Sequence, residues 1–102
     1  MAEHATYFRY KVLPGKRQAV MDLFDKWERE QKPKAKGFIR SIIVASNDDP
    51  DELTSVARFD STENYTANSN RPEQGAWFRE LRSNLAADPE WFNGTVIRET
   101  SA

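Results

Sequence analysis

Hydrophobic and polar residues alternate along residues 6–12, with the period of two that is typical of β-strands. In this stretch Phe8, Tyr10 and Val12 alternate with more polar neighbours. Three other stretches are rich in β-branched and aromatic residues, which favour strands. The pattern therefore predicts strands at residues 6–12, 38–46, 53–59 and 91–98.

A helical periodicity separates the first two of these strands. Apolar residues recur at spacings of three and four, which places them on one stripe of an amphipathic helix. They are Val20, Leu23, Phe24 and Trp27. Pro33 and Gly37 follow, and both residue types are common where helices end. The pattern predicts a helix at residues 16–31.

Two further helices are predicted between the third and fourth strands. Asp60 to Glu63 form a capping box, in which Asp60 accepts a hydrogen bond from the amide of Glu63 and starts a short polar helix at residues 61–69. Pro72 suits the first turn of a second helix, which ends before Asp88 and Pro89. The apolar residues of this second helix recur every four positions, at Trp77, Leu81 and Leu85.

The order of these elements predicts an α+β fold of the ferredoxin-like βαββαβ type, with residues 1–102 as a single domain. In this fold a four-stranded antiparallel sheet is covered by helices on one face. Apolar residues occur at both strand parities, so the second face of a monomer would expose a large apolar patch. We therefore expect a homodimer in which two sheets pack face to face. The pattern leaves open which strand parity lines the helix-facing side.

The amino-acid composition argues against several classes of partner and site. The 15 basic and 16 acidic residues nearly cancel, which argues against a nucleic-acid or membrane-surface partner. No apolar run is long enough for a membrane span or a secretory signal, so we expect a cytoplasmic protein. The chain has no cysteine, which excludes disulfides and thiolate chemistry. Its one histidine, His4, argues against a multi-histidine metal site, and we expect it in a disordered terminus without a role.

Three motifs at the junctions of the predicted elements resemble a known family. They are Pro14-Gly15-Lys16 after the first strand, Gly37-Phe38 at the start of the second, and Phe59 to Tyr65 between the third strand and the short helix. With this element order they are similar to the antibiotic biosynthesis monooxygenase (ABM) group of the dimeric α/β-barrel superfamily. The resemblance implies a dimeric α/β barrel and an oxygenase that acts on aromatic molecules without a cofactor or metal.

The sequence departs from this family at two sets of positions. Active oxygenases of the family typically carry a tryptophan at the end of the third strand and an asparagine four residues earlier, where this chain has Phe59 and Ser55. Its haem-degrading members carry a histidine on the helix after Pro72 and an asparagine near the position of Phe8. The chain has neither, so the resemblance does not extend to haem degradation. Tyr65 matches an aromatic position of the family's short helix.

Cofactor-free oxygenation defines the side chains that such a site needs. The substrate itself supplies electrons to O2 once it has lost a proton, so the protein must stabilise an oxyanion and exclude water. We predict Tyr65 as a catalytic hydrogen-bond donor and Arg40 as a catalytic charge stabiliser. The predicted substrate-binding residues are Arg9, Ser55, Phe59 and Trp77. Each also has a structural interpretation, such as core packing for Trp77 and a dimer-interface ion pair for Arg40.

Two functional hypotheses follow, from different classes. The first is a cofactor-independent monooxygenase that acts on a small aromatic substrate of quinol or anthrone type. The alternative is a non-catalytic dimer that binds a small aromatic or apolar ligand, or is associated with stress. An RNA-recognition module shares the element order, and Lys36 to Arg40 partly matches its aromatic motif. That segment lacks the second aromatic residue and lies on the second strand, so we expect no nucleic-acid partner.

Overall fold

The computed structural model of the chain describes residues 2–102, and its elements follow the predicted order with an additional 3-10 helix, η1. They are β1 (His4–Lys11), α1 (Arg17–Glu30), η1 (Lys32–Lys34), β2 (Phe38–Ala45), β3 (Glu52–Phe59), α2 (Thr62–Ser69), α3 (Pro72–Arg82) and β4 (Glu90–Thr95). None of the helices within residues 2–102 is long and apolar enough to cross a membrane.

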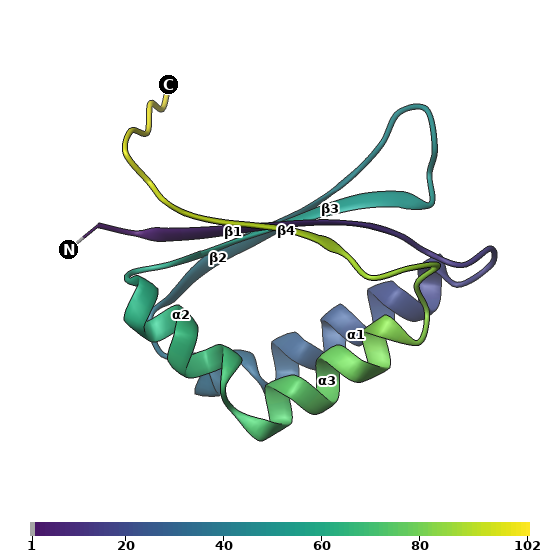
Figure 1. Cartoon of the computed structure of the whole chain (residues 1–102), viewed down its shortest axis with the longest axis horizontal. Helices are drawn as coiled ribbons and strands as arrows, with labels where there is room; N and C mark the ends of the chain where they lie inside the picture. The colour runs from purple at the N-terminus through teal and green to yellow at the C-terminus, as the bar shows by residue number, and fades with distance from the viewer. Residues whose placement is uncertain (1) are drawn as a thin grey trace.

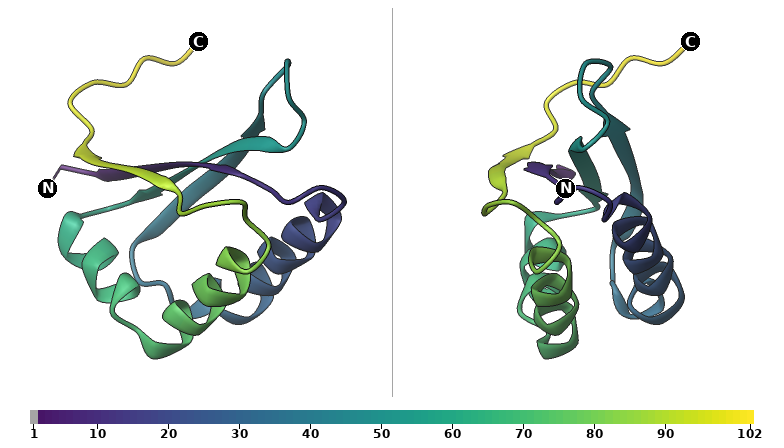
Figure 2. Two further views of the ribbon diagram at one scale, coloured as in Figure 1. Left: turned by 45° about the vertical axis from the view of Figure 1, so that its right-hand side comes forward. Right: turned by 90° about the vertical axis from the view of Figure 1, so that its right-hand side faces the viewer.

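The four strands form one antiparallel sheet in the order β2-β3-β1-β4. Figure 1 shows the three α-helices on one side of this sheet, and the C-terminal segment leaving on the other side. In the right-hand view of Figure 2, α1 forms one column beneath the sheet, and α2 followed by α3 forms the other. The α+β, ferredoxin-like architecture predicted from the sequence is confirmed.

The helix-facing side of the sheet is set by strand alternation. In β1 the buried residues are His4, Thr6, Phe8 and Tyr10, and the residues between them point to the opposite side. In β3 the matching buried residues are Leu53, Ser55 and Phe59. Because neighbouring strands are in register, these residues share one surface, which faces the helices. The sheet surface away from the helices is called the open face below.

The hydrophobic core lies between one end of the sheet and the helices α1 and α3. Its most buried side chains, each no more than 1% exposed, are Val12, Val20, Leu53 and Leu81. The indole N–H of Trp77 donates a 2.7 Å hydrogen bond to the carbonyl of Leu23, which ties α3 to α1. This bond satisfies the polar atom of a buried tryptophan, as packing in a core requires.

A β-bulge in β2 changes which side chains share a face. Phe38 pairs with Phe59, but the register then shifts, and Arg40 pairs with Arg58. Simple alternation would place Phe38 and Arg40 on the same face. Since a bulge inserts one extra residue, Phe38 faces the helices while Arg40 lies on the open face. The bulge therefore removes Arg40 from the helix-facing side.

The structure corrects two predicted element ends. Ser61, and not Asp60, caps α2, because Ser61 has extended backbone angles and its hydroxyl accepts from the amide of Asn64 at 3.1 Å. The carboxylate of Asp60 instead accepts from the side chain of Asn64 at 2.7 Å. At the other end, α3 stops at Arg82, and Leu85 lies beyond it in a turn that bridges to Val12.

Candidate active site

A cavity of about 360 Å³ lies between the sheet and the helices. Residues from all four strands and from α1, α2 and α3 line it. Its volume falls within the roughly 300–1,000 Å³ that small-molecule sites occupy. Its aromatic lining residues are Phe8, Phe24, Trp27, Phe38, Phe59, Tyr65, Trp77, Phe78 and Trp91.

The polar part of this lining carries no formal charge. It consists of hydroxyl and amide side chains, namely Thr6, Ser41, Ser55, Asn68, Ser69, Gln74 and Asn93. The other lining residues are aliphatic or glycine. Burying an ion here is costly, because it loses hydration and meets no opposite charge in the lining. The cavity therefore suits a neutral, flat aromatic molecule with few polar groups.

Four of the six predicted site residues line this one cavity: Tyr65, Ser55, Phe59 and Trp77. Arg9 and Arg40 do not, because both lie on the open face of the sheet. Arg9 alternates with the buried residues of β1 and forms an ion pair with Glu52. Arg40 is moved to the open face by the bulge in β2. The structure therefore separates both arginines from the cavity, contrary to the prediction that they act there with Tyr65.

His4 is a structured residue, and the prediction that it lies in a disordered terminus is wrong. It begins β1, and 4% of its surface is exposed. Its ring stacks on that of Tyr65, with centroids 4.2 Å apart and planes 17° apart. Tyr65 also contacts Phe59 edge to face, at 5.5 Å between centroids. These two contacts hold the Tyr65 ring at the wall of the cavity.

A chain of hydrogen bonds connects His4 to the cavity lining. His4 Nε2 lies 2.7 Å from Thr6 Oγ1, and the Thr6 hydroxyl donates to Asn93 Oδ1 at 2.8 Å. On the other side of the ring, His4 Nδ1 lies 3.0 Å from Thr62 Oγ1. Thr6 and Asn93 both line the cavity. The imidazole is therefore one hydroxyl away from the space that a ligand would occupy.

A buried hydrogen bond between Tyr10 and Ser55 holds the side chain of Ser55 in place. The hydroxyls of Tyr10 and Ser55 are 2.8 Å apart, and either can donate. Burial raises the pKa of Tyr10, and its hydrogen bond to Ser55 offsets part of that rise. Tyr10 therefore remains a neutral phenol at physiological pH. It holds the Ser55 hydroxyl in position without bringing a charge to the lining.

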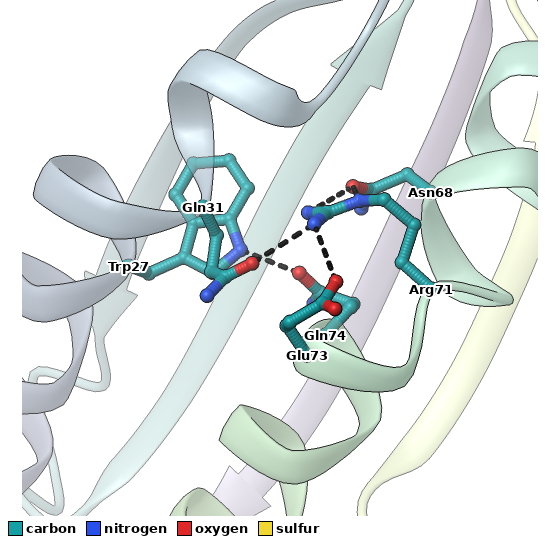
Figure 3. A network of polar contacts seen from close by, with 6 residues as sticks. All are labelled: Trp27, Gln31, Asn68, Arg71, Glu73 and Gln74. Atoms are coloured by element: carbon teal, nitrogen blue, oxygen red, sulfur yellow. Dashed lines mark hydrogen bonds and ion pairs between the residues drawn. The ribbon is translucent and has the colours of Figure 1, made fainter.

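A network of polar side chains connects α1, α2 and α3 beside the cavity, as Figure 3 shows. The indole N–H of Trp27 on α1 donates to Gln74 Oε1 on α3 at 2.7 Å. Arg71, between α2 and α3, donates to Asn68 Oδ1 from Nε at 3.1 Å and from Nη2 at 2.9 Å. It also donates to Gln31 Oε1 at 3.0 Å. Since Arg71 occupies the amide oxygen of Asn68, the N–H groups of that amide are left as donors for the cavity.

Residues 4–80 match the family model described as antibiotic biosynthesis monooxygenase. The chain belongs to this family. The match covers most of the chain and includes Tyr65, Asn68 and Trp77, but it ends before β4. No curated protein matches the chain. The family inferred from the junction motifs is thus confirmed.

Solved structures give the same result for the fold. A conserved protein from Methanosarcina mazei Go1 superimposes with a TM-score of 0.81 at 19% identity, covering 92% of each chain. Rv0793 from Mycobacterium tuberculosis gives 0.81 at 18% identity, covering 98% of this chain and 100% of that one. A mutant of SnoaB, a cofactor-independent oxygenase from Streptomyces nogalater, gives 0.80 at 15% identity, covering 97% of both chains.

Sequence reasoning missed four residues around the cavity of this family member: His4, Thr6, Asn68 and Asn93. A signal existed for the first two, because they continue the alternation of Phe8 and Tyr10 toward the N-terminus. Asn68 gave no such signal, since α2 is polar along its length and Asn68 resembles its solvated neighbours. Only the packing of α2 against α3 shows that Asn68 is 6% exposed.

Proposed function

We propose that this protein is a cofactor-independent monooxygenase that acts on a small aromatic substrate of quinol or anthrone type. The observation that carries the proposal is the uncharged, aromatic-lined cavity with hydrogen-bond donors at its wall. Family membership and the SnoaB-like fold support it. The lack of cysteine and the near-neutral charge fit action in the cytoplasm, which we also propose.

The chemistry needs little from the protein beyond this arrangement. An anthrone-like CH2 group loses one proton to give an enolate, which then transfers electrons to O2. One oxygen atom becomes the product C=O, and the other leaves as water together with the two hydrogens. The rate depends on how well the enolate oxygen is stabilised as it forms, and donors fixed in advance in a dry cavity do this best.

Tyr65 and Asn68 supply such donors from α2. The ring of Tyr65 is fixed between His4 and Phe59, so its hydroxyl is directed with little freedom. The amide of Asn68 is fixed by Arg71, which also polarises its N–H groups. Phe59 and Trp77 act as apolar walls for a flat ring. Together these four residues provide a holder for the ring and two donors for its oxygen.

Changing Tyr65 to phenylalanine is expected to lower oxygen uptake about tenfold. The variant keeps both ring contacts and loses one hydrogen bond to a developing anion, which contributes about 1.5 kcal/mol. The measurement is O2 consumption with a panel of anthrones and hydroquinones, without added flavin or metal. Tyr7→Phe is the matched control, because Tyr7 lies on the open face. Equal rates in wild type and Tyr65→Phe would remove Tyr65 from the mechanism.

A non-catalytic ligand-binding role is the second candidate. It is favoured by Phe59 and Ser55, which stand where active oxygenases of this family typically have tryptophan and asparagine. Phe59 retains an apolar wall but provides no indole N–H. Tight binding of aromatic ligands by the wild-type protein, with no oxygen uptake across the whole panel, would decide for this role.

We propose that the protein is a homodimer, joined through the open face. This face carries exposed apolar side chains from β1, β2 and β4, among them Tyr7, Ile42, Val44 and Phe92. Ile42 is 55% and Phe92 67% exposed, and monomers rarely leave such a set uncovered. Arg58, which bonds to Glu3 and Glu99, lies beside this set and holds the pKa of Glu99 below its usual value.

Changing Ile42 to aspartate is expected to convert the dimer to a monomer. The carboxylate would be buried against apolar side chains at the centre of the interface, where desolvation is costly. Native mass spectrometry at a low micromolar concentration measures the change. Leu13→Asp is the control, because Leu13 is exposed but lies outside the sheet. A wild-type protein that is itself monomeric would contradict the proposed dimer.

A further inference from the structure

We infer that His4 receives the proton that the substrate loses in the cavity, through the hydroxyl of Thr6. This inference rests on the proposed function in one respect, which is that the ligand is a phenol or an enol. The lining itself has no group that accepts a proton readily at neutral pH, because its residues are hydroxyls, amides and apolar side chains. His4 is the one histidine of the chain and lies directly behind Thr6.

The hydrogen bonds around the ring allow it to take up a proton without losing a partner. Each ring nitrogen faces a threonine hydroxyl, Thr6 at 2.7 Å and Thr62 at 3.0 Å. Because the Thr6 hydroxyl donates to Asn93 Oδ1, it accepts from Nε2–H in this arrangement, and Nδ1 accepts from Thr62. A hydroxyl can also turn to donate, so the ring keeps two partners in either neutral tautomer and as the imidazolium. In the form that accepts a proton, the Thr6 hydroxyl turns from Asn93 to donate to Nε2, and Nδ1–H donates to Thr62.

An aromatic ring also lies against the imidazole. The Tyr65 ring lies parallel to the imidazole at 4.2 Å, a distance at which an aromatic face attracts a cation. The ring contacts Thr62 and Tyr65 from α2 and Thr6 on β1, and His4 pairs with Phe59 on β3 and Thr95 on β4. No positively charged side chain is among them.

The proton transfer is balanced within the molecule. The O–H proton of a phenol, or of the enol tautomer of an anthrone, passes to Thr6 Oγ1 as the hydrogen of Thr6 passes to His4 Nε2. The substrate remains in the cavity as a phenolate or enolate, and His4 becomes an imidazolium. Thr6 ends the step as a neutral hydroxyl. In this role His4 is a positioning residue, since it acts on the substrate through Thr6.

The test uses 4-nitrophenol under anaerobic conditions, because its neutral and anionic forms absorb at different wavelengths. At a pH where the free phenol is neutral, we expect the wild-type protein to bind it and to show the phenolate band. The second readout is the ¹⁵N chemical shift of the His4 ring, which should move to imidazolium values on binding. The assignment is unambiguous because the chain has one histidine. Neither readout depends on oxygenation.

Two variants and a matched control test the path. In His4→Gln and in Thr6→Val, the phenol is expected to bind, measured by quenching of tryptophan fluorescence, but to remain neutral. Thr95→Val is the control, because Thr95 pairs with His4 between β1 and β4 but takes no part in the hydrogen-bond chain. This variant should keep the phenolate band.

The outcomes separate this inference from the proposed oxygenase activity. A phenolate band that persists in His4→Gln, or wild-type protein that does not bind the phenol, would overturn the proton path. Oxygen uptake with anthrones that is equal in wild type and His4→Gln would overturn it as well, while keeping the oxygenase. The band and the imidazolium signal without any oxygen uptake would support the path and remove the oxygenase.

Discussion

Changing Asn68 to aspartate is expected to lower kcat for oxygen uptake about a hundredfold while the fold stays intact. Loss of one fixed donor from an oxyanion site costs roughly 100–1,000-fold in kcat. The aspartate replaces the N–H donors of Asn68 by a carboxylate oxygen, which repels the enolate as it forms. Steady-state oxygen consumption with the best substrate of the panel measures the effect.

The geometry around Arg71 makes this variant informative. Arg71 bonds to the amide oxygen of Asn68 through Nε and Nη2, and an aspartate oxygen can accept both bonds in the same place. The free energy of unfolding should therefore be retained, so a loss of activity reports on the donor and not on the fold. Asn70→Asp is the control, because Asn70 is exposed at the end of the same helix. Full activity in Asn68→Asp would show that this amide does not contact the reacting oxygen.

Changing Gly37 to alanine is expected to lower the free energy of unfolding by about 3 kcal/mol, from backbone strain and steric overlap. Gly37 has φ +81°, a conformation that alanine adopts only with strain. A Cβ there would also lie 2.3 Å from Asp60 Oδ1 and 2.7 Å from Asn64 Nδ2. These two atoms form the hydrogen bond at the start of α2, so the overlap would displace the helix that carries Tyr65 and Asn68.

Gly15 provides a matched control for this prediction. It has φ +77°, close to that of Gly37, but a Cβ there would meet nothing within 4 Å. Gly15→Ala is therefore expected to lose only the backbone contribution, about 1 kcal/mol. Thermal unfolding followed by circular dichroism compares the two variants, and the Tm of Gly37→Ala should fall by roughly 12–24 °C. Equal losses in the two variants would show that the contact with Asp60 has no energetic role.

Local sequence patterns were sufficient to predict the order and type of the main elements. The period of two in β1 and the spacing of Val20, Leu23 and Trp27 in α1 are local signals, because each reports which side of one element is buried. The junction motifs at Gly15, Gly37 and Phe59 were also local, and they identified the family. Four of the six predicted site residues, including Tyr65 and Phe59, lie around one cavity, because they were chosen from these local motifs and patterns. Their roles remain predictions.

The tertiary structure alone decided which residues face that cavity. A single bulge in β2 moved Arg40 to the open face, and the pattern of its strand gives no sign of the extra residue. The amide oxygen of Asn68 is bound by Arg71, which lies beyond the end of α2. His4 contacts Tyr65 and Thr6 because β1 extends far enough toward the N-terminus to place it between them. Such contacts join residues from different elements, so no periodicity within one segment can encode them.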